Sequence, residues 1–310
     1  MSLKTESKVT RHLFAGAVAA AVVGASSIAH ADVQVGDSLK IKGFADMSTY
    51  NLKPSGGSSD SSAESISADV GIQYGEKFGG GGTGTYIQQA TVSKALTDEF
   101  KIKFGRFLSY SGWETEEPTG LFQSTGSGYA PLFYGYYQNG VSASYNSEGF
   151  DLMGSVVTSA FNPLDSDAKK LGYEIGAAIK PVAGLVGKAF YIKDSDSSTD
   201  IVNTWVSYSA NGFTFAGEYN SANYAAGAKG DGYLVMGNYA TGPLSVTLRY
   251  VDYGTKNGRG VKTLSTSSIT LSPSYKVSDN LSLISEYRKD TVKVGGTDSD
   301  RITLEALFSF

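Results

Sequence analysis

Apolar and polar residues alternate at every second position in many short segments of the chain. The clearest case is the C-terminal segment, whose apolar face consists of Ile302, Leu304, Ala306, Phe308 and Phe310. The positions between them hold Arg301, Thr303, Glu305 and Ser309. Segments 171–180 and 244–250 repeat the pattern. Strand side chains point alternately to two faces, so this period predicts half-buried β-strands, whereas no segment after residue 31 keeps the 3.6-residue period of a helix.

The connections between these segments are alternately short and long. Short turns are expected at 96–98, 146–149, 180–182, 210–212, 240–243 and 277–280. Longer polar loops are expected at 108–132, 162–168, 194–199, 222–230, 255–262 and 293–299. Short turns on one side and long loops on the other are typical of an up-and-down membrane barrel.

The number of strands follows from counting back from the C-terminus. Twelve strands fit between about residue 99 and the end, and two more lie near 84–96 and 66–76. A first strand near 38–50 and a weak one within 55–65 give sixteen, whereas leaving out the first segment gives fourteen. We expect an all-β fold, a single transmembrane antiparallel up-and-down barrel of about 16 strands, with 14 as the alternative.

The N-terminus predicts export. Lys4, Lys8 and Arg11 precede an apolar stretch over 13–28, and the small residues of 29–31 follow it. This order is that of a secretory signal peptide, with an uncleaved anchor as the alternative. We therefore expect a signal peptide over 1–31 and a barrel domain over 32–310.

Composition removes several classes of function. The chain has no cysteine, and its two histidines, His12 and His30, both lie within the expected signal peptide. Histidine-based catalytic triads and the common zinc sites therefore lack their residues in the exported part. We expect no catalytic residue, no metal and no cofactor. The net charge of −4 makes nucleic acid an unexpected partner.

The polar faces of the expected strands favour a membrane barrel over a soluble β-sandwich, which alternation alone would also fit. A barrel of fourteen to sixteen strands is too wide for side chains to fill, so its lining should be polar and wet. Candidate pore-lining residues are Lys40, Lys42, Lys101, Lys103, Arg249, Glu286 and Arg288. Aromatic residues gather near strand ends, as in interfacial girdles. The terminal Phe310 is the expected assembly signal.

Several segments before and after the longest loop resemble a known family. They are Tyr110 to Glu114, Pro118 to Gln123 and Gly140 to Tyr145, with Gln88 to Ser93 and Lys103 to Phe107 before them. These segments are similar to those of the OmpL-like family of β-barrel porins. The resemblance implies a porin fold and an outer-membrane location, and no defined substrate. The Ser/Gly-rich second strand departs from the family and leaves the strand count open.

The longest loop, at about 108–132, is the candidate constriction. It carries Trp113, Glu114, Glu116 and Glu117. One interpretation folds this loop into the lumen, with its carboxylates facing the basic wall. The other leaves it outside as a solvated loop, since acidic external loops are common.

The expected function is a porin of the Gram-negative outer membrane that lets small polar solutes or ions diffuse through its lumen. A mild anion preference is predicted because expected lumen-facing cations outnumber the anions there. The cations are Lys40, Lys42, Lys101, Lys103, Lys188, Arg249, Arg288 and Arg301. The anions are Asp46, Glu174, Glu218, Glu286 and Glu305, whereas Asp194 is expected in a loop. Selectivity follows the charges that line a pore and its constriction.

Expected partners are outer-membrane lipids and lipopolysaccharide, the barrel-assembly machinery, small solutes and further copies of the chain. The alternatives are a structural or adhesive barrel without an open channel, and an outer-membrane enzyme. An energy-coupled receptor is disfavoured, because the chain is too short for a plug domain and about twenty-two strands.

Overall fold

The computed structural model describes residues 33–35, 39–41, 43–54, 61–70, 73–77 and 84–309, apart from 115–116 and 162–168. For residues up to 88 it describes the backbone alone. The expected signal peptide, Lys42, Glu116 and Phe310 lie outside the described residues.

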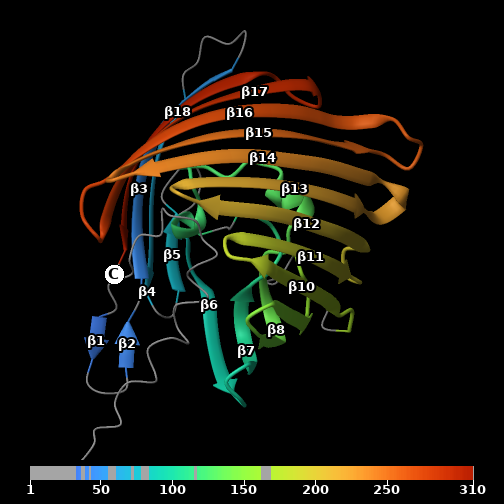
Figure 1. Cartoon of the computed structure of the whole chain (residues 1–310). Coiled ribbons are helices and arrows are strands. Elements are labelled where there is room, and N and C mark those ends of the chain that lie inside the picture. The colour runs from blue at the N-terminus through green and yellow to red at the C-terminus, as the bar shows by residue number, and fades with distance from the viewer. Residues whose placement is uncertain are drawn as a thin grey trace, which may run out of the picture.

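Nearly all of the described chain is β-strand, arranged in two sheets (Figure 1). The small sheet pairs β1 (Val33–Val35) with β2 (Leu39–Ile41). The large sheet contains β3 (Gly43–Pro54), β4 (Ser61–Val70), β5 (Gln73–Lys77), β6 (Gly84–Ala95), β7 (Phe100–Leu108), β8 (Tyr137–Asn146), β9 (Phe150–Val157), β10 (Gly172–Val182), β11 (Leu185–Asp194), β12 (Thr199–Ala210), β13 (Phe213–Asn223), β14 (Lys229–Thr241), β15 (Leu244–Lys256), β16 (Lys262–Lys276), β17 (Leu281–Val294) and β18 (Ser299–Ser309). Short helices are η1 (Pro118–Gly120), α1 (Ala130–Phe133) and η2 (Ala225–Gly227).

The large sheet is an up-and-down barrel wall of sixteen strands. Each paired strand is antiparallel to its neighbour in sequence, from β5 through β18. The last strand, β18, then pairs with β3, from Ser309 opposite Phe44 to Ser299 opposite Pro54. Strands β4 and β5 end the hydrogen-bonded order and lie next to each other. The predicted all-β barrel of sixteen strands is confirmed, and the second strand lies at 61–70, later than the segment expected for it.

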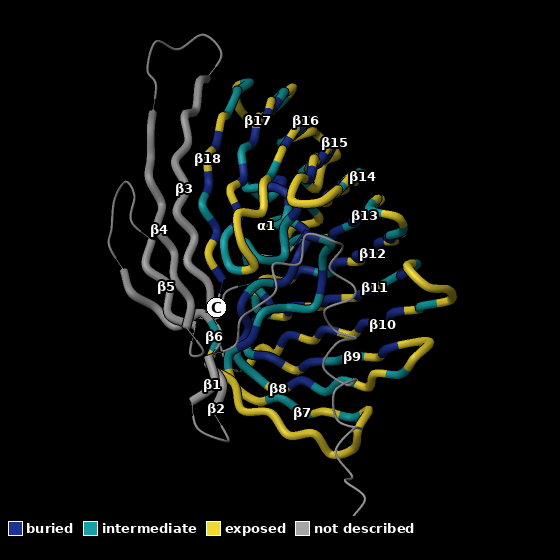
Figure 2. The backbone as a smooth tube through the Cα atoms, turned by 60° about the vertical axis from the view of Figure 1, so that its left-hand side comes forward, coloured by how far each residue is buried: buried dark blue, intermediate teal, exposed yellow. Residues whose placement is uncertain are grey.

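The two faces of the barrel wall have opposite polarity, and the apolar face is outside. Along β15, Leu244, Val246 and Leu248 are 53%, 46% and 53% exposed, whereas Thr247 and Arg249, at the alternate positions, are buried. The same alternation of buried and exposed residues follows β10 to β18 (Figure 2). A soluble protein would bury the apolar set, so this arrangement places hydrocarbon outside and polar groups inside.

Exposed aromatic rings mark the end of the wall at the short turns. Phe213 lies 4.4 Å from Tyr239 and 6.0 Å from Phe215 between ring centroids, and all three are exposed. Such rings suit the headgroup region of a bilayer. The adjacent turn places Asn211 and Gly212 at φ values of 51° and 81°, which only the permissive residues of a tight hairpin adopt readily.

The segment between β7 and β8, described at 109–114 and 117–136, runs inside the barrel, and we call it the internal loop. Its Tyr129 and Phe133 are completely buried, and they pack in one cluster with Leu234 and Val251 from the inner face of the wall. Its helix α1 contacts β12 and β13 and lies on the concave side of the sheet (Figure 2). Among the described residues, no helix is both long enough and apolar enough to cross a membrane.

Candidate functional site

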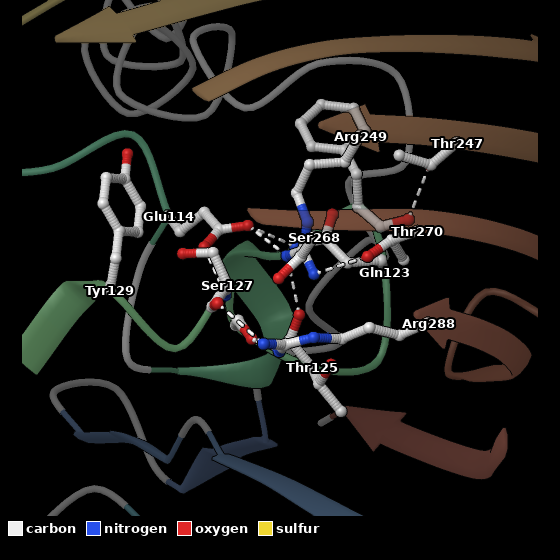
Figure 3. A network of polar contacts seen from close by, with 12 residues as sticks. Glu114, Gln123, Thr125, Ser127, Tyr129, Thr247, Arg249, Ser268, Thr270 and Arg288 are labelled. Atoms are coloured by element: carbon white, nitrogen blue, oxygen red, sulfur yellow. Dashed lines mark hydrogen bonds and ion pairs between the residues drawn. The ribbon is translucent and has the colours of Figure 1, made fainter. Parts of the chain in front are cut away.

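A buried ion pair joins the internal loop to the wall. Arg249 projects inward from β15 and pairs with Glu114, and their side chains are 0% and 3% exposed (Figure 3). Arg249 also donates to the Thr125 carbonyl at 2.8 Å and to Thr270 Oγ1 at 2.9 Å. The second carboxylate oxygen of Glu114 accepts the Ser127 amide at 2.7 Å. Each charge is thus compensated by an opposite charge and by further hydrogen bonds, which offsets the cost of burial.

A second group on β17 holds the same part of the loop. Arg288 donates to the carbonyls of Gly126 and Ser127 at 2.7 and 2.9 Å, and its Nε donates to Asp290 at 2.7 Å. Glu286 accepts the backbone amide of Thr125 at 2.9 Å. Figure 3 shows Arg249 and Arg288 reaching the loop from different strands. Two arginines therefore fix the backbone around residues 125–127.

A third attachment surrounds Glu218 on β13. Its carboxylate accepts the Trp113 amide at 2.9 Å and the Asn203 side-chain amide at 2.5 Å. Tyr129 and Tyr134 of the internal loop donate their hydroxyls to the other oxygen. Burial first, and then the charge of Glu218, raise the pKa of both tyrosines well above its usual value, so they stay protonated and remain donors.

A fourth attachment is Glu174 on β10, whose carboxylate is completely buried. It accepts from Ser109 Oγ at 2.8 Å, from the Tyr110 amide at 3.1 Å and from Gln138 at 3.0 Å. The internal loop is therefore bound along the wall from β10 to β17. The inward carboxylates at these attachments accept hydrogen bonds from donors of the internal loop.

The structure brings most of the sequence-predicted residues of this region together. Trp113 stacks on Phe122 at 5.9 Å between centroids and meets Trp205 edge-on at 5.1 Å. Glu117 accepts a hydrogen bond from Gln89 on β6. Arg249, Glu286 and Arg288 hold the loop as described above.

The predicted lysines are distributed differently. Lys103 lies over the rings of Phe107 and Tyr110 at 5.6 and 5.2 Å, whereas Lys101 is exposed near the turn end of β7. Lys40 lies in β2, in the small sheet and not in the sixteen-stranded wall, and its side chain is not described.

Some residues of the site were not predicted from the sequence. Asn203 could have been found, because it shares the inward face of β12 with Ile201 and Trp205. Nothing in the sequence pattern places Tyr129 and Tyr134 against Glu218, because a loop has no periodicity to orient its side chains.

The interpretation of Asp194 as a loop residue is wrong. It ends β11, is 1% exposed and accepts from Ser159 and the Ala160 amide at 2.6 and 2.8 Å. In the described part of the chain, no group of three or more Asp, Glu, His or Cys residues could hold a metal ion.

Comparison with known proteins agrees with this geometry. The family model for Gram-negative porins matches residues 17–295. Similar solved structures include Salmonella typhi OmpF in complex with daunomycin, with 15% identity, a TM-score of 0.68, and coverage of 90% of this chain and 100% of that one. The anion-selective porin from Comamonas acidovorans has 15% identity and a TM-score of 0.61, with coverage of 87% of this chain and 98% of that one. A trimer form of in-vitro folded OmpT from Vibrio cholerae has 14% identity and a TM-score of 0.58, with coverage of 87% of this chain and 99% of that one.

No curated protein matches the chain significantly. The family match nevertheless covers most of the sequence, and it agrees with an apolar outer face, a polar lumen and a loop folded inside the wall. The chain therefore belongs to the Gram-negative porin family and forms a channel in the outer membrane.

Proposed function

We propose that this porin is a passive channel for small polar solutes and ions, and that the internal loop sets the narrowest part of the passage. The observation that carries the proposal is the buried pair between Glu114 and Arg249, which fixes the loop inside the barrel. Because this loop occupies lumen that the wall alone would leave open, it limits the size of solutes that pass. We assign the protein a channel activity rather than an enzymatic one, because the family is one of porins and histidine-based triads lack their residues after residue 30.

The passage prefers anions mildly, because carboxylates of the described wall are already engaged. Glu174, Glu218 and Glu286 accept from the internal loop, and Asp290 pairs with Arg288. Asp151 pairs with Lys180 at 2.7 Å.

Two other inward lysines differ from Lys180, because they form no ion pair with a described residue. Lys103 lies over the rings of Phe107 and Tyr110, and Lys188 lies 5.0 Å from the ring centre of Trp205. A compensated charge contributes little field to the pore, so these lysines dominate selectivity. The similar fold of an anion-selective porin also supports a preference for anions.

Planar-bilayer recording of the purified protein tests both parts. We expect discrete conductance steps and a reversal potential on the anion side in a salt gradient. The variant Lys103→Gln/Lys188→Gln should move the reversal potential toward cations. Lys193→Gln removes a charge from the outer face of β11 and should leave it unchanged. Absence of steps would favour a structural or adhesive barrel, and a cation-selective wild type would refute the charge argument.

Export, assembly and oligomeric state complete the proposal. Residues 1–31 are a cleaved signal peptide, and Phe310 is read by the barrel-assembly machinery. The chain forms a homo-oligomer among lipids and lipopolysaccharide, which the trimer form of a structural neighbour supports. Phe310→Asp should reduce outer-membrane levels in cells, whereas Glu148→Gln in an exposed turn should not. Normal levels of Phe310→Asp would overturn the assigned assembly signal.

A further inference from the structure

A cavity of about 480 Å³ lies between the internal loop and the wall strands β11 and β12. Its loop side includes Trp113, Phe122 and Tyr134, and its wall side includes Lys188 and Trp205. The volume falls within the range of roughly 300–1,000 Å³ that small-molecule sites occupy. The cavity adjoins the Arg249 attachment, because Glu114 is one of its lining residues, whereas Arg249 and Arg288 themselves are not in the lining.

The walls of this cavity are largely aromatic and form flat surfaces. The rings of Trp113 and Phe122 are nearly parallel, with 14° between their planes, and Trp205 meets Trp113 at 73°. Flat rings meeting at such angles accept another planar group by stacking or edge contact. A planar ligand would therefore gain more binding free energy from these rings than a branched ligand would.

One cation of the lining, Lys188, forms no ion pair with a described residue. Its ammonium lies 5.0 Å from the centre of the Trp205 ring, and Asp151, the carboxylate that interacts with it electrostatically, is itself paired with Lys180 at 2.7 Å. The carboxylate in the lining, Glu114, is already occupied by Arg249, Gln123 and the Ser127 amide. The charge that the cavity offers to a ligand is therefore positive.

A second polar group of the lining is also unsatisfied. The indole Nε1 of Trp205 is buried and donates to no acceptor among the described residues. A buried donor without an acceptor is unfavourable, but this atom has almost no accessible surface, so a ligand in the cavity does not reach it without a shift of the ring. A carboxylate in the cavity pairs instead with Lys188, by a charge-assisted contact that a neutral sugar hydroxyl makes less strongly.

We propose that this cavity is a binding site for small aromatic carboxylates on their way through the channel. The ring lies among Trp113, Phe122 and Trp205, and the carboxylate lies at Lys188. This proposal rests on the proposed channel function, because it names the class of solute that the channel binds during passage. It adds a site that slows one class of anion relative to chloride.

Tryptophan fluorescence of the purified full chain tests the site without requiring conductance. The sequence has two tryptophans, Trp113 and Trp205, and both line the cavity. Benzoate is the probe, and the controls are benzamide, which keeps the ring without the charge, and acetate, which keeps the charge without the ring. We expect saturable change of the emission with benzoate at concentrations at least about tenfold below those needed for either control.

Lys188→Gln should weaken benzoate binding about tenfold and leave benzamide unchanged, because it removes the charge-assisted contact alone. Lys193→Gln, on the outer face of the same strand, should bind as the wild type does. A heat-dependent gel shift checks that each variant is folded. Should Lys188→Gln fail this check, the three probes on the wild type still decide the question.

In bilayers, benzoate should interrupt the chloride current of the wild type and interrupt it less in Lys188→Gln. Equal responses to benzoate and benzamide, or an unchanged response in folded Lys188→Gln, would overturn the site. A saturable fluorescence response in a protein that conducts nothing would support the site and refute the channel function, so the two failures are distinguishable.

Discussion

Glu114→Gln is the most informative change to the internal loop. It keeps the shape of the side chain and removes the charge that compensates Arg249, whose side chain is fully buried. Breaking a buried pair from one side costs about 3–5 kcal/mol, because the remaining charge stays desolvated. The amide also has a single acceptor oxygen, whereas Glu114 accepts on both oxygens from Arg249, Gln123 and the Ser127 amide. In either orientation the new NH₂ group faces a donor.

The lost free energy destabilises the position of the internal loop and leaves the strands of the wall unaffected. The contacts at Glu174, Glu218 and Glu286 remain, and the strand ladders do not involve Glu114. We therefore expect a barrel that still shows its heat-dependent gel shift and a loop that leaves its position more often. Single-channel conductance should rise and become noisier, and the reversal potential should move further toward anions, because Arg249 loses its counter-charge.

A double-mutant cycle separates this mechanism from a general disturbance. In Glu114→Gln/Arg249→Met the unpaired charge is gone. The destabilisation of the loop in the double variant should therefore be smaller than the sum of the destabilisations in the two single variants. Glu148→Gln makes the same chemical change in an exposed turn and should behave as the wild type does. Unchanged conductance and selectivity in Glu114→Gln would refute the view that this pair positions the loop.

Three further predictions concern the loop tyrosines, a turn and the lipid face. Because burial raises the pKa values of Tyr129 and Tyr134 above their usual 10.0, their contribution to loop stability should be complete at neutral pH and decline only above about pH 10, which conductance measured against pH checks. Gly212→Ala should cost about 1–2 kcal/mol in barrel stability by urea titration, because its φ is 81° and a Cβ would lie 2.4 Å from a backbone oxygen, whereas Gly149→Ala has open space and should cost little. Leu248→Arg, on the outward face of β15, should cost about 2–4 kcal/mol if it lies at mid-membrane, and a normal unfolding midpoint would contradict the assigned lipid face.

The sequence predicted the wall far better than it predicted what lies inside it. Alternation marks which residues of β15 face outward, so the inward position of Arg249 followed directly from that of Leu248. The second strand, β4, reads SSAESISADV and has little polarity difference between its faces, so its position could not be read with the same accuracy. A one-residue shift there changes little free energy, and the pattern cannot fix it.

The loop contacts depend on interactions between distant parts of the sequence. Glu114 and Arg249 are 135 positions apart, and no local rule connects them. The composition of the loop indicated a constriction but left an external position equally open. Asp194 shows a different limit, because it continues the inward face of Phe190 and Ile192 but the sequence does not mark where β11 ends. Its carboxylate accepts from Ser159 and from the Ala160 amide, which are distant in the sequence.

The ladder between β18 and β3 joins the last strand of the chain to the first strand of the wall. Until β18 is present, β3 and β17 each keep a row of backbone N–H and C=O groups without partners. In hydrocarbon each such group costs several kcal/mol, so a wall without β18 is far less stable in the bilayer. The persistence of the channel in the membrane therefore depends on this one strand, whose hydrogen bonds satisfy β3 on one side and β17 on the other.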